Sequence, residues 1–218
     1  METFFHFAWQ HLPALLKGTE ATLVIWIISV TFGFFFGWCL ALARAYCKWV
    51  GRVLATGYIE LFRGTPMLVQ MFIIYMGLPS LGIVLSPITA AIVAIGLNTA
   101  AYQAEYFRAG IGSIPSGQMV AARSIGMSRS QAIRNILIPQ AMRIALPQWS
   151  NEIILELKYT SIAFAIGVQE LMGQAKLIGS NTFDYFQIFV VAAVIYVVLV
   201  SAITTVLGQL EKQYALRQ

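Results

Sequence analysis

Two glutamates that lie four residues apart in an otherwise apolar stretch are the clearest chemical feature of the sequence. Glu152 and Glu156 share one face of a helix, because side chains at positions i and i+4 point the same way. Tyr159 and Thr160 continue that face, and Asn98 lies in another apolar stretch. Ionisable residues inside a membrane span are costly and therefore indicate a functional site. Together these side chains predict a substrate site that suits an ammonium or guanidinium group better than a carboxylate side chain.

The two glutamates also have a purely structural interpretation, in which they pair with groups in the protein and only hold helices together. Lys158 is a poor partner for Glu156 within one helix, because two residues correspond to a rotation of about 200°. It could instead reach a neighbouring subunit or the carboxylate of a substrate, or extend to the membrane surface. Both interpretations of the glutamates stay open at the level of sequence.

The composition indicates that these glutamates belong to a membrane protein. Of the 218 residues, 59% are hydrophobic and 11% are charged, whereas a soluble domain carries about 25% charged residues. The mean hydropathy of +0.75 agrees with a membrane protein. The net charge of +5 does not indicate nucleic-acid binding, because the basic residues lie in gaps between apolar runs. We expect a single transmembrane domain over residues 1–218.

Five apolar runs predict an all-α, polytopic fold with about five transmembrane helices. A helix needs about 20 apolar residues to cross the hydrocarbon core of a bilayer. The runs cover residues 21–42, 55–78, 84–106, 144–168 and 186–210. A longer and more polar connection, residues 107–140, separates the third run from the fourth.

The distribution of lysine and arginine predicts the orientation of the chain in the membrane. Eleven of the fourteen basic residues, including Lys212 and Arg217, lie after the first span, at the start of the second, in the long connection or at the C-terminus. The other three are Lys17, Lys158 and Lys176. Because cytoplasmic loops carry the excess of basic residues, we expect the connection and the C-terminus in the cytoplasm and the N-terminus outside, in a cell inner membrane.

The long connection contains the signals of two short helices. A first helix is predicted over about 117–124, and Gly126 then suits a cap or turn. Ser128 with Gln131 three residues later forms a capping-box pattern that starts a second helix, which we expect Pro139 to end. The periodicity alone would also fit an amphipathic loop that lies on the membrane surface.

The same connection resembles a known signature. Residues 119–126 (MVAARSIG) and 136–139 (ILIP) resemble the EAA signature of importer permeases in the ATP-binding cassette (ABC) superfamily. Ala121, Ala122 and Gly126 match that pattern in register, whereas Val120 stands where the family has glutamate. Five further segments resemble the polar amino acid permeases in order and spacing: residues 60–66 (ELFRGTP), 96–98 (GLN), 105–111 (EYFRAGI), 113–118 (SIPSGQ) and 151–152 (NE). The resemblance covers residues 19–211.

The resemblance implies an EAA helix-turn-helix that docks on a cytoplasmic ATPase. The residues expected to couple the two subunits are Ala121, Ala122, Gly126, Ser128 and Arg129. The family assembly implies two ATPase subunits, a second permease that is a copy or a paralogue, and an extracytoplasmic amino acid-binding protein. ATP and Mg²⁺ would belong to the ATPase, and this chain is expected to hold no cofactor or metal of its own. No lysine follows a glycine in the sequence, so the phosphate-binding loop of an ATPase is missing.

Basic or amide amino acids are the expected substrates. Some relatives carry aspartate where Tyr159 stands, whereas Glu156 adds a carboxylate nearby. Two other functions compete with an ABC permease. An ion-coupled secondary transporter would show inverted repeats, and no motif occurs twice. A non-transporting membrane subunit would not need Glu152 within a span. An enzyme has no supporting constellation of residues.

Overall fold

The computed structural model describes residues 2–214, so Arg217 lies outside the described residues. Of the described residues, 89% are helical and none lies in a β-strand, which confirms the all-α prediction. The α-helices are α1 (Glu2–Tyr46), α2 (Trp49–Gly64), α3 (Met67–Phe72), α4 (Pro87–Gly112), α5 (Gly117–Ser124), α6 (Arg129–Ala132), α7 (Ile138–Tyr159), α8 (Leu171–Thr182) and α9 (Tyr185–Tyr214). Two π-helical segments, η1 (Ile73–Gly77) and η3 (Ile133–Leu137), and two 3₁₀ segments, η2 (Leu78–Leu81) and η4 (Thr160–Ile166), extend them.

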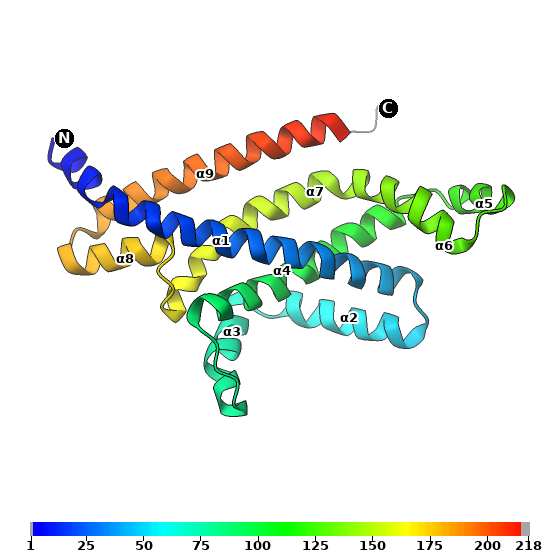
Figure 1. Cartoon of the computed structure of the whole chain (residues 1–218), viewed down its shortest axis with the longest axis horizontal. Coiled ribbons are helices and arrows are strands. Elements are labelled where there is room, and N and C mark those ends of the chain that lie inside the picture. Colours follow the sequence, from blue (N-terminus) through cyan, green and yellow to red (C-terminus); the bar gives the residue numbers. More distant parts are fainter. Residues whose placement is uncertain (1, 215–218) are drawn as a thin grey trace.

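Helix α4 packs against both α1 and α7, and it crosses α1 in the view of Figure 1. Small residues let the backbones approach, as is common between helices in membranes. Gly37 of α1 faces α4 so closely that an added Cβ would lie 3.0 Å from the carbonyl oxygen of Ala100 and 3.1 Å from the nitrogen of Ala104. Both alanines are fully buried. Helices α1 and α4 therefore form a closely packed pair, against which α2, α7 and α8 pack.

Four of the five predicted spans lie largely within one helix or its 3₁₀ extension, whereas the second is divided between α2 and α3. By length and apolarity alone, α1 and α9 can cross a membrane, and the α2–α3 pair makes a third span if it is counted as one. Helices α4 and α7 are more polar, since they carry residues such as Asn98 and Glu152. Of the predicted substrate residues, Asn98 lies on α4, Glu152, Glu156 and Tyr159 lie on α7, and Thr160 begins η4.

The second span is broken, whereas the sequence predicted a continuous helix over 55–78. Helix α2 ends at Gly64, and the axis bends by 104° before α3. Pro66 has no N–H to donate, and it disfavours helical conformation in the residue before it. Thr65 accordingly has extended backbone angles, φ −120° and ψ 143°. The bend directs α3 away from the bundle (Figure 1).

Helix α8 lies at the end of the bundle opposite α5 and α6 (Figure 1). It was not predicted from the sequence. Its N-cap is Glu170, whose carboxylate accepts hydrogen bonds from the nitrogens of Met172 (2.9 Å) and Gly173 (2.8 Å). The hydroxyl of Tyr196 on α9 donates to the same carboxylate at 3.1 Å, and that of Thr22 on α1 at 3.4 Å. The fully buried Glu170 thus joins three helices.

Candidate functional site

A cavity of about 670 Å³ lies between the break in the second span, α4 and α7. This volume is within the range of small-molecule sites. Its polar and aromatic lining comprises Arg63, Thr65, Asn98, Tyr102, Tyr106, Glu152 and Tyr159. The cavity therefore brings together a cationic group, a carboxylate and three phenols.

Helices α4 and α7 present these groups across the cavity. Asn98, Tyr102 and Tyr106 follow one another at intervals of four residues, so they share one face of α4. Across the gap, Glu152 and Tyr159 lie on α7. The Tyr106 hydroxyl donates a hydrogen bond to Oε2 of Glu152 at 2.8 Å. This bond holds the carboxylate at the cavity wall and leaves its other oxygen available to accept from a ligand.

The amide of Asn98 also holds the break in the second span. Its nitrogen donates to the carbonyl oxygen of Phe62 at 3.1 Å and to Oε1 of Gln70 at 2.9 Å. The Gln70 nitrogen in turn donates to the carbonyl oxygens of Phe62 (2.8 Å) and Thr65 (3.0 Å). Asn98 thus lines the cavity, while its amide N–H groups position the bent backbone.

Two of the predicted substrate residues, Glu156 and Thr160, do not line this cavity. Glu156 is 1% exposed, and neither of its carboxylate oxygens has a hydrogen-bond partner among the described residues. Thr160 is fully buried and donates back to the carbonyl oxygen of Leu157 at 2.7 Å. The structure therefore separates the two glutamates, with Glu152 at the cavity and Glu156 within the helix packing.

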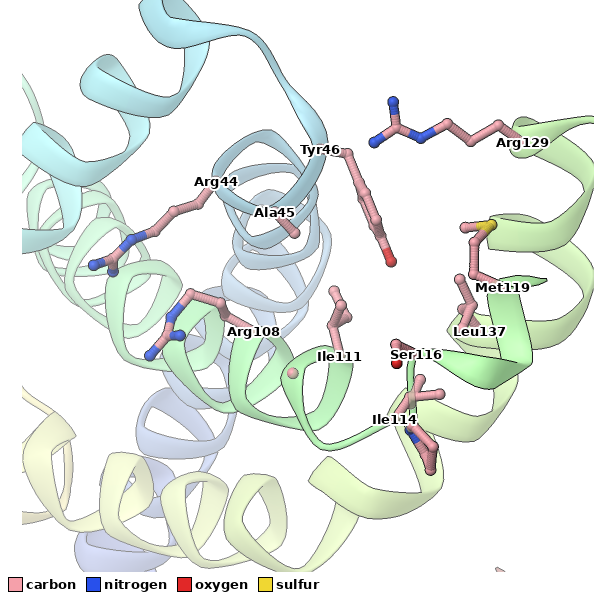
Figure 2. A pocket seen from close by; sticks show the side chains of 12 residues that line it. Arg44, Ala45, Tyr46, Arg108, Ile111, Ile114, Ser116, Met119, Arg129 and Leu137 are labelled. Carbon is pink, nitrogen blue, oxygen red and sulfur yellow. The ribbon is translucent and has the colours of Figure 1, made fainter.

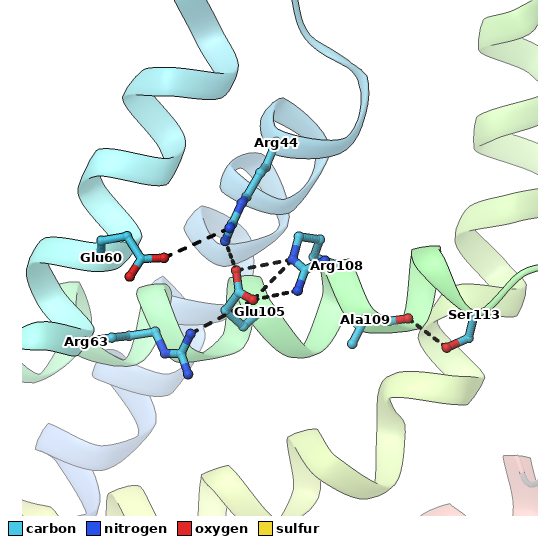
Figure 3. A network of polar contacts seen from close by, with 7 residues as sticks. All are labelled: Arg44, Glu60, Arg63, Glu105, Arg108, Ala109 and Ser113. Atoms are coloured by element: carbon cyan, nitrogen blue, oxygen red, sulfur yellow. Dashed lines mark hydrogen bonds and ion pairs between the residues drawn. The ribbon is translucent and has the colours of Figure 1, made fainter. Parts of the chain in front are cut away.

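A charge cluster fixes the ends of α1, α2 and α4 beside the cavity (Figure 3). The Glu105 carboxylate accepts hydrogen bonds from Arg44 of α1 and from Arg108, whose Nη2 lies at 2.8 Å. Nη1 of Arg63, on α2, lies 3.9 Å from the same carboxylate. The guanidinium of Arg63 also lies 5.3 Å from the ring centroid of Tyr102. Arg63 is thereby held at the cavity wall.

Several residues of the site were not predicted as functional. Tyr102 and Tyr106 follow Asn98 at helical spacing, and this regular pattern could have identified them. Arg63 and Gln70 carry no such signal, because their positions depend on the bend in the second span. Among the side chains of residues 4–214, no group of three from His, Cys, Asp or Glu could hold a metal ion.

The segment after α4 forms the predicted pair of short helices. Helix α5 covers Gly117–Ser124, as predicted, and Gly126 follows with a left-handed φ of +88°. The nitrogens of Gly126 and Met127 donate to the carbonyl oxygens of Arg123 (3.1 Å) and Ala122 (3.2 Å), which completes a Schellman cap. The predicted capping box is also confirmed: the nitrogen of Gln131 donates to Oγ of Ser128 at 3.2 Å, and the Ser128 nitrogen donates back to Oε1 at 2.7 Å.

This hairpin, residues 117–137, presents a mixed outer surface. Ala122 is buried, whereas Ala121, Gly126, Ser128 and Arg129 are exposed. Two apolar side chains on it are also exposed, Val120 at 64% and Ile125 at 78%. The predicted coupling residues therefore lie on one projecting element, and most of them can contact another molecule.

The prediction that Pro139 ends the second helix of the hairpin is wrong. The chain passes from α6 through the π-helical segment η3 into α7, which begins at Ile138. Pro139 lies in the first turn of α7, where its missing N–H is tolerated. The wider π turn, closed by the Ile138 nitrogen on the carbonyl oxygen of Ile133, leads directly into this turn. Hairpin and α7 are consequently one continuous helical path.

Comparisons with known proteins agree with this arrangement. Residues 21–213 match the family described as binding-protein-dependent transport system inner membrane component. A probable amino-acid ABC transporter permease of Bacillus subtilis is 40% identical over 210 residues, which is 94% of this chain and 91% of the relative. The glutamine transport system permease of Escherichia coli is 34% identical over 94% of each chain.

A solved structure gives the same result for the fold. The crystal structure of an amino acid ABC transporter with histidines contains a chain that is 37% identical, with a TM-score of 0.87. The match covers 94% of this chain and 95% of that one. The family match spans most of the sequence, and the relatives align over almost their whole length. The chain belongs to the family of binding-protein-dependent transport system inner membrane components.

Proposed function

We propose that this permease subunit serves an ATP-driven amino acid importer and that its substrates are basic or amide amino acids. The observation that carries the proposal is Glu152, a carboxylate that faces a cavity between two membrane helices. A family of membrane transport components and relatives named as amino acid permeases support the transport function. The names of two of them, a glutamine permease and a transporter solved with histidines, support the substrate class.

The chemistry of the cavity favours a zwitterion with a further polar or cationic side chain. Arg63 offers a guanidinium to the α-carboxylate of an amino acid, since arginine binds carboxylates well. Glu152 can accept from an ammonium, guanidinium or amide group at the other end. Tyr102 and Tyr106 add ring faces, which attract cations. An acidic side chain would be repelled by Glu152.

Uptake by the complete importer, reconstituted in liposomes, tests this proposal. We expect uptake of arginine or glutamine in preference to glutamate. Glu152→Gln removes the charge but keeps the shape, and a hydrogen bond to a charged group contributes about 1.5–3 kcal/mol. The apparent affinity for arginine should therefore fall by about 10- to 100-fold, and that for glutamine by much less.

Glu156→Gln is the matched control, because it is the same change one helical turn away and outside the cavity. We expect it to leave the ratio of arginine to glutamine uptake unchanged. An equal change of selectivity in both variants would contradict the assignment to Glu152 alone and would return Glu156 to the substrate site. Uptake of glutamate as efficient as that of arginine would refute the proposed substrate class.

For energy coupling, we propose that the hairpin docks on a cytoplasmic ATPase subunit, which carries ATP and Mg²⁺ and is present in two copies in the complete importer. The exposed apolar side chains Val120 and Ile125 suit such a contact, since apolar groups on a projecting surface often mark a protein interface. Ile125→Asp should abolish substrate-stimulated ATP hydrolysis and weaken co-purification of the ATPase. Ser113→Asp, an equal charge on an exposed residue outside the hairpin, should do neither. Normal stimulation in the Ile125 variant would contradict the docking surface.

The remaining assembly follows from the same proposal. A second permease, a copy or a paralogue, would cover Leu155 and Tyr159, which are 38% and 42% exposed beside the cavity. An extracytoplasmic binding protein would deliver substrate at the end that carries α8. The N-terminus would lie outside, and the hairpin and C-terminus in the cytoplasm, because basic residues gather at the hairpin end. Co-purification of two differently tagged copies distinguishes a homodimer from a paired paralogue, and cysteine labelling from either side tests the orientation.

A further inference from the structure

A second cavity, of about 530 Å³, lies between the hairpin and the ends of α1 and α4 (Figure 2). Arginines from three elements line it: Arg44 of α1, Arg108 of α4 and Arg129 of α6. In Figure 2, Arg44 and Arg108 lie on one side and Arg129 on the other, with Tyr46 between them. The residues come from distant parts of the sequence, so this basic cavity exists only in the folded chain.

The arginines around this cavity carry more positive charge than the nearby carboxylates balance. Glu105 is shared by Arg44, Arg63 and Arg108, and Nη2 of Arg44 lies 4.0 Å from the mostly exposed Glu60. Arg63 lines the other cavity, so at this one Arg44 and Arg108 face two carboxylates. A guanidinium carries five N–H groups, so those of Arg44 and Arg108 exceed what Glu105 can accept.

Arg129 adds the positive charge that is left unbalanced at this cavity. No carboxylate of residues 4–214 lies within 4.0 Å of its guanidinium. The guanidinium lies 5.9 Å from the ring centroid of Tyr46. Arg129 is on the hairpin and Tyr46 is at the end of α1, so this contact bridges two elements.

Neutral donors and apolar groups complete the lining. The hydroxyls of Tyr46 and Ser116 are available, and each can donate a hydrogen bond to an anion. Ile111, Met119 and Leu137 supply apolar surface beside these polar groups. A ligand that fits must therefore combine an anionic group with hydrocarbon.

We propose that this cavity binds the phosphate headgroup of an anionic phospholipid and so joins the hairpin to the ends of α1 and α4. Basic pockets at the ends of membrane helices are suited to such headgroups. A soluble phosphate would satisfy the arginines but leave the apolar lining uncovered, which favours the lipid as the occupant. The proposal rests on the chain being a membrane permease, but it concerns binding and does not depend on the transported substrate.

The test uses the full-length chain, with the subunits that co-purify, in bilayers of phosphatidylcholine that contain a photoreactive phosphatidylglycerol. Peptides cross-linked to this lipid are identified by mass spectrometry. We expect cross-links to residues that line the cavity, and competition by unlabelled phosphatidylglycerol but not by phosphatidylcholine. Arg129→Gln should reduce this cross-linking about fivefold, as expected for the loss of one basic residue near an anionic lipid surface. Arg129→Lys should retain most of it.

Arg134→Gln is the matched control, because Arg134 is an exposed arginine of the same hairpin that does not line the cavity. It should leave the cavity cross-links unchanged. Equal loss in both glutamine variants would indicate general attraction to the membrane and overturn the proposal. Displacement of the lipid by millimolar inorganic phosphate alone would assign the cavity to a soluble anion instead. Neither result bears on amino acid uptake, which tests the proposed function separately.

Discussion

The side chain of Gln70 holds the backbone beside the cavity of about 670 Å³, so the shape of that cavity depends on this one residue. It is 6% exposed and lies on α3, just after the break in the second span. Its nitrogen donates to the carbonyl oxygens of Phe62 and Thr65, and its oxygen accepts from Asn98. The bent backbone cannot form helical hydrogen bonds at Pro66, so this side chain replaces part of what the helix loses.

The substitution Gln70→Leu removes all these bonds while keeping a side chain of similar size. One side-chain hydrogen bond contributes about 1 kcal/mol, and a buried group left without a partner costs about 1–3 kcal/mol. Phe62 keeps its bond from Asn98, but the carbonyl of Thr65 and one donor of Asn98 lose theirs. We therefore expect a loss of about 3 kcal/mol in the free energy of unfolding.

Chemical unfolding of the purified chain in detergent measures this loss, and uptake by the reconstituted importer measures its effect on the cavity. We expect a lower unfolding midpoint together with a weaker apparent affinity for substrate, because Arg63 precedes the break and lines the cavity. Gln148→Leu, at an exposed position of α7, is the control and should change neither. If Gln70→Leu left both midpoint and affinity at their original values, the break would not depend on this side chain.

Three further substitutions test packing and caps. Gly110→Ala would place a Cβ 2.5 Å from the carbonyl oxygen of Ala141, so it should separate α4 from α7 and lower the unfolding free energy by about 1–3 kcal/mol. The control Gly112→Ala places a Cβ with nothing within 4 Å and should not destabilise the chain. Equal effects of the two substitutions would refute this account. Gly126→Ala also meets no neighbour but must adopt a φ of +88°, so it should cost about 1 kcal/mol and reduce ATPase stimulation without preventing assembly. Glu170→Gln replaces one acceptor oxygen of a buried N-cap and should cost about 1–2 kcal/mol, seen as faster proteolysis around α8; unchanged proteolysis would show that the cap is dispensable.

The hairpin was predicted well because its signals are local. The cap at Gly126 and the capping box at Ser128 involve residues three to five positions apart, so a short stretch of sequence contains both partners of each interaction. The two prolines show where local reasoning stops. Pro66 breaks a helix that was expected to continue, whereas Pro139 is accommodated in one that was expected to end. The difference lies in Gln70 and in the π turn before Pro139, and neither has a sequence pattern of its own.

The candidate site was predicted in part for a related reason. Asn98, Glu152 and Tyr159 do meet at one cavity. A helical pattern assigns Glu156 to the same face as Glu152, since four residues correspond to about 400° and leave the two side chains about 40° apart. How α4 and α7 pack against each other decides whether a side chain rotated by about 40°, such as Glu156, reaches the cavity or is buried in the helix packing. That relation is not contained in the periodicity of either helix.

The continuity of the hairpin with α7 gives the proposed coupling a short mechanical path. Fourteen residues separate the start of α7 at Ile138 from Glu152, which is about 21 Å along a helix. A displacement of the hairpin is therefore carried along one helix to the carboxylate at the cavity wall. The opposite wall belongs to α4, and the 2.8 Å bond from Tyr106 to Glu152 crosses between them. Movement of α7 must strain or break that bond and so change the affinity of the cavity for a cationic group. Because binding linkage is reciprocal, a substrate that engages Glu152 must bias the position of the hairpin to the same extent.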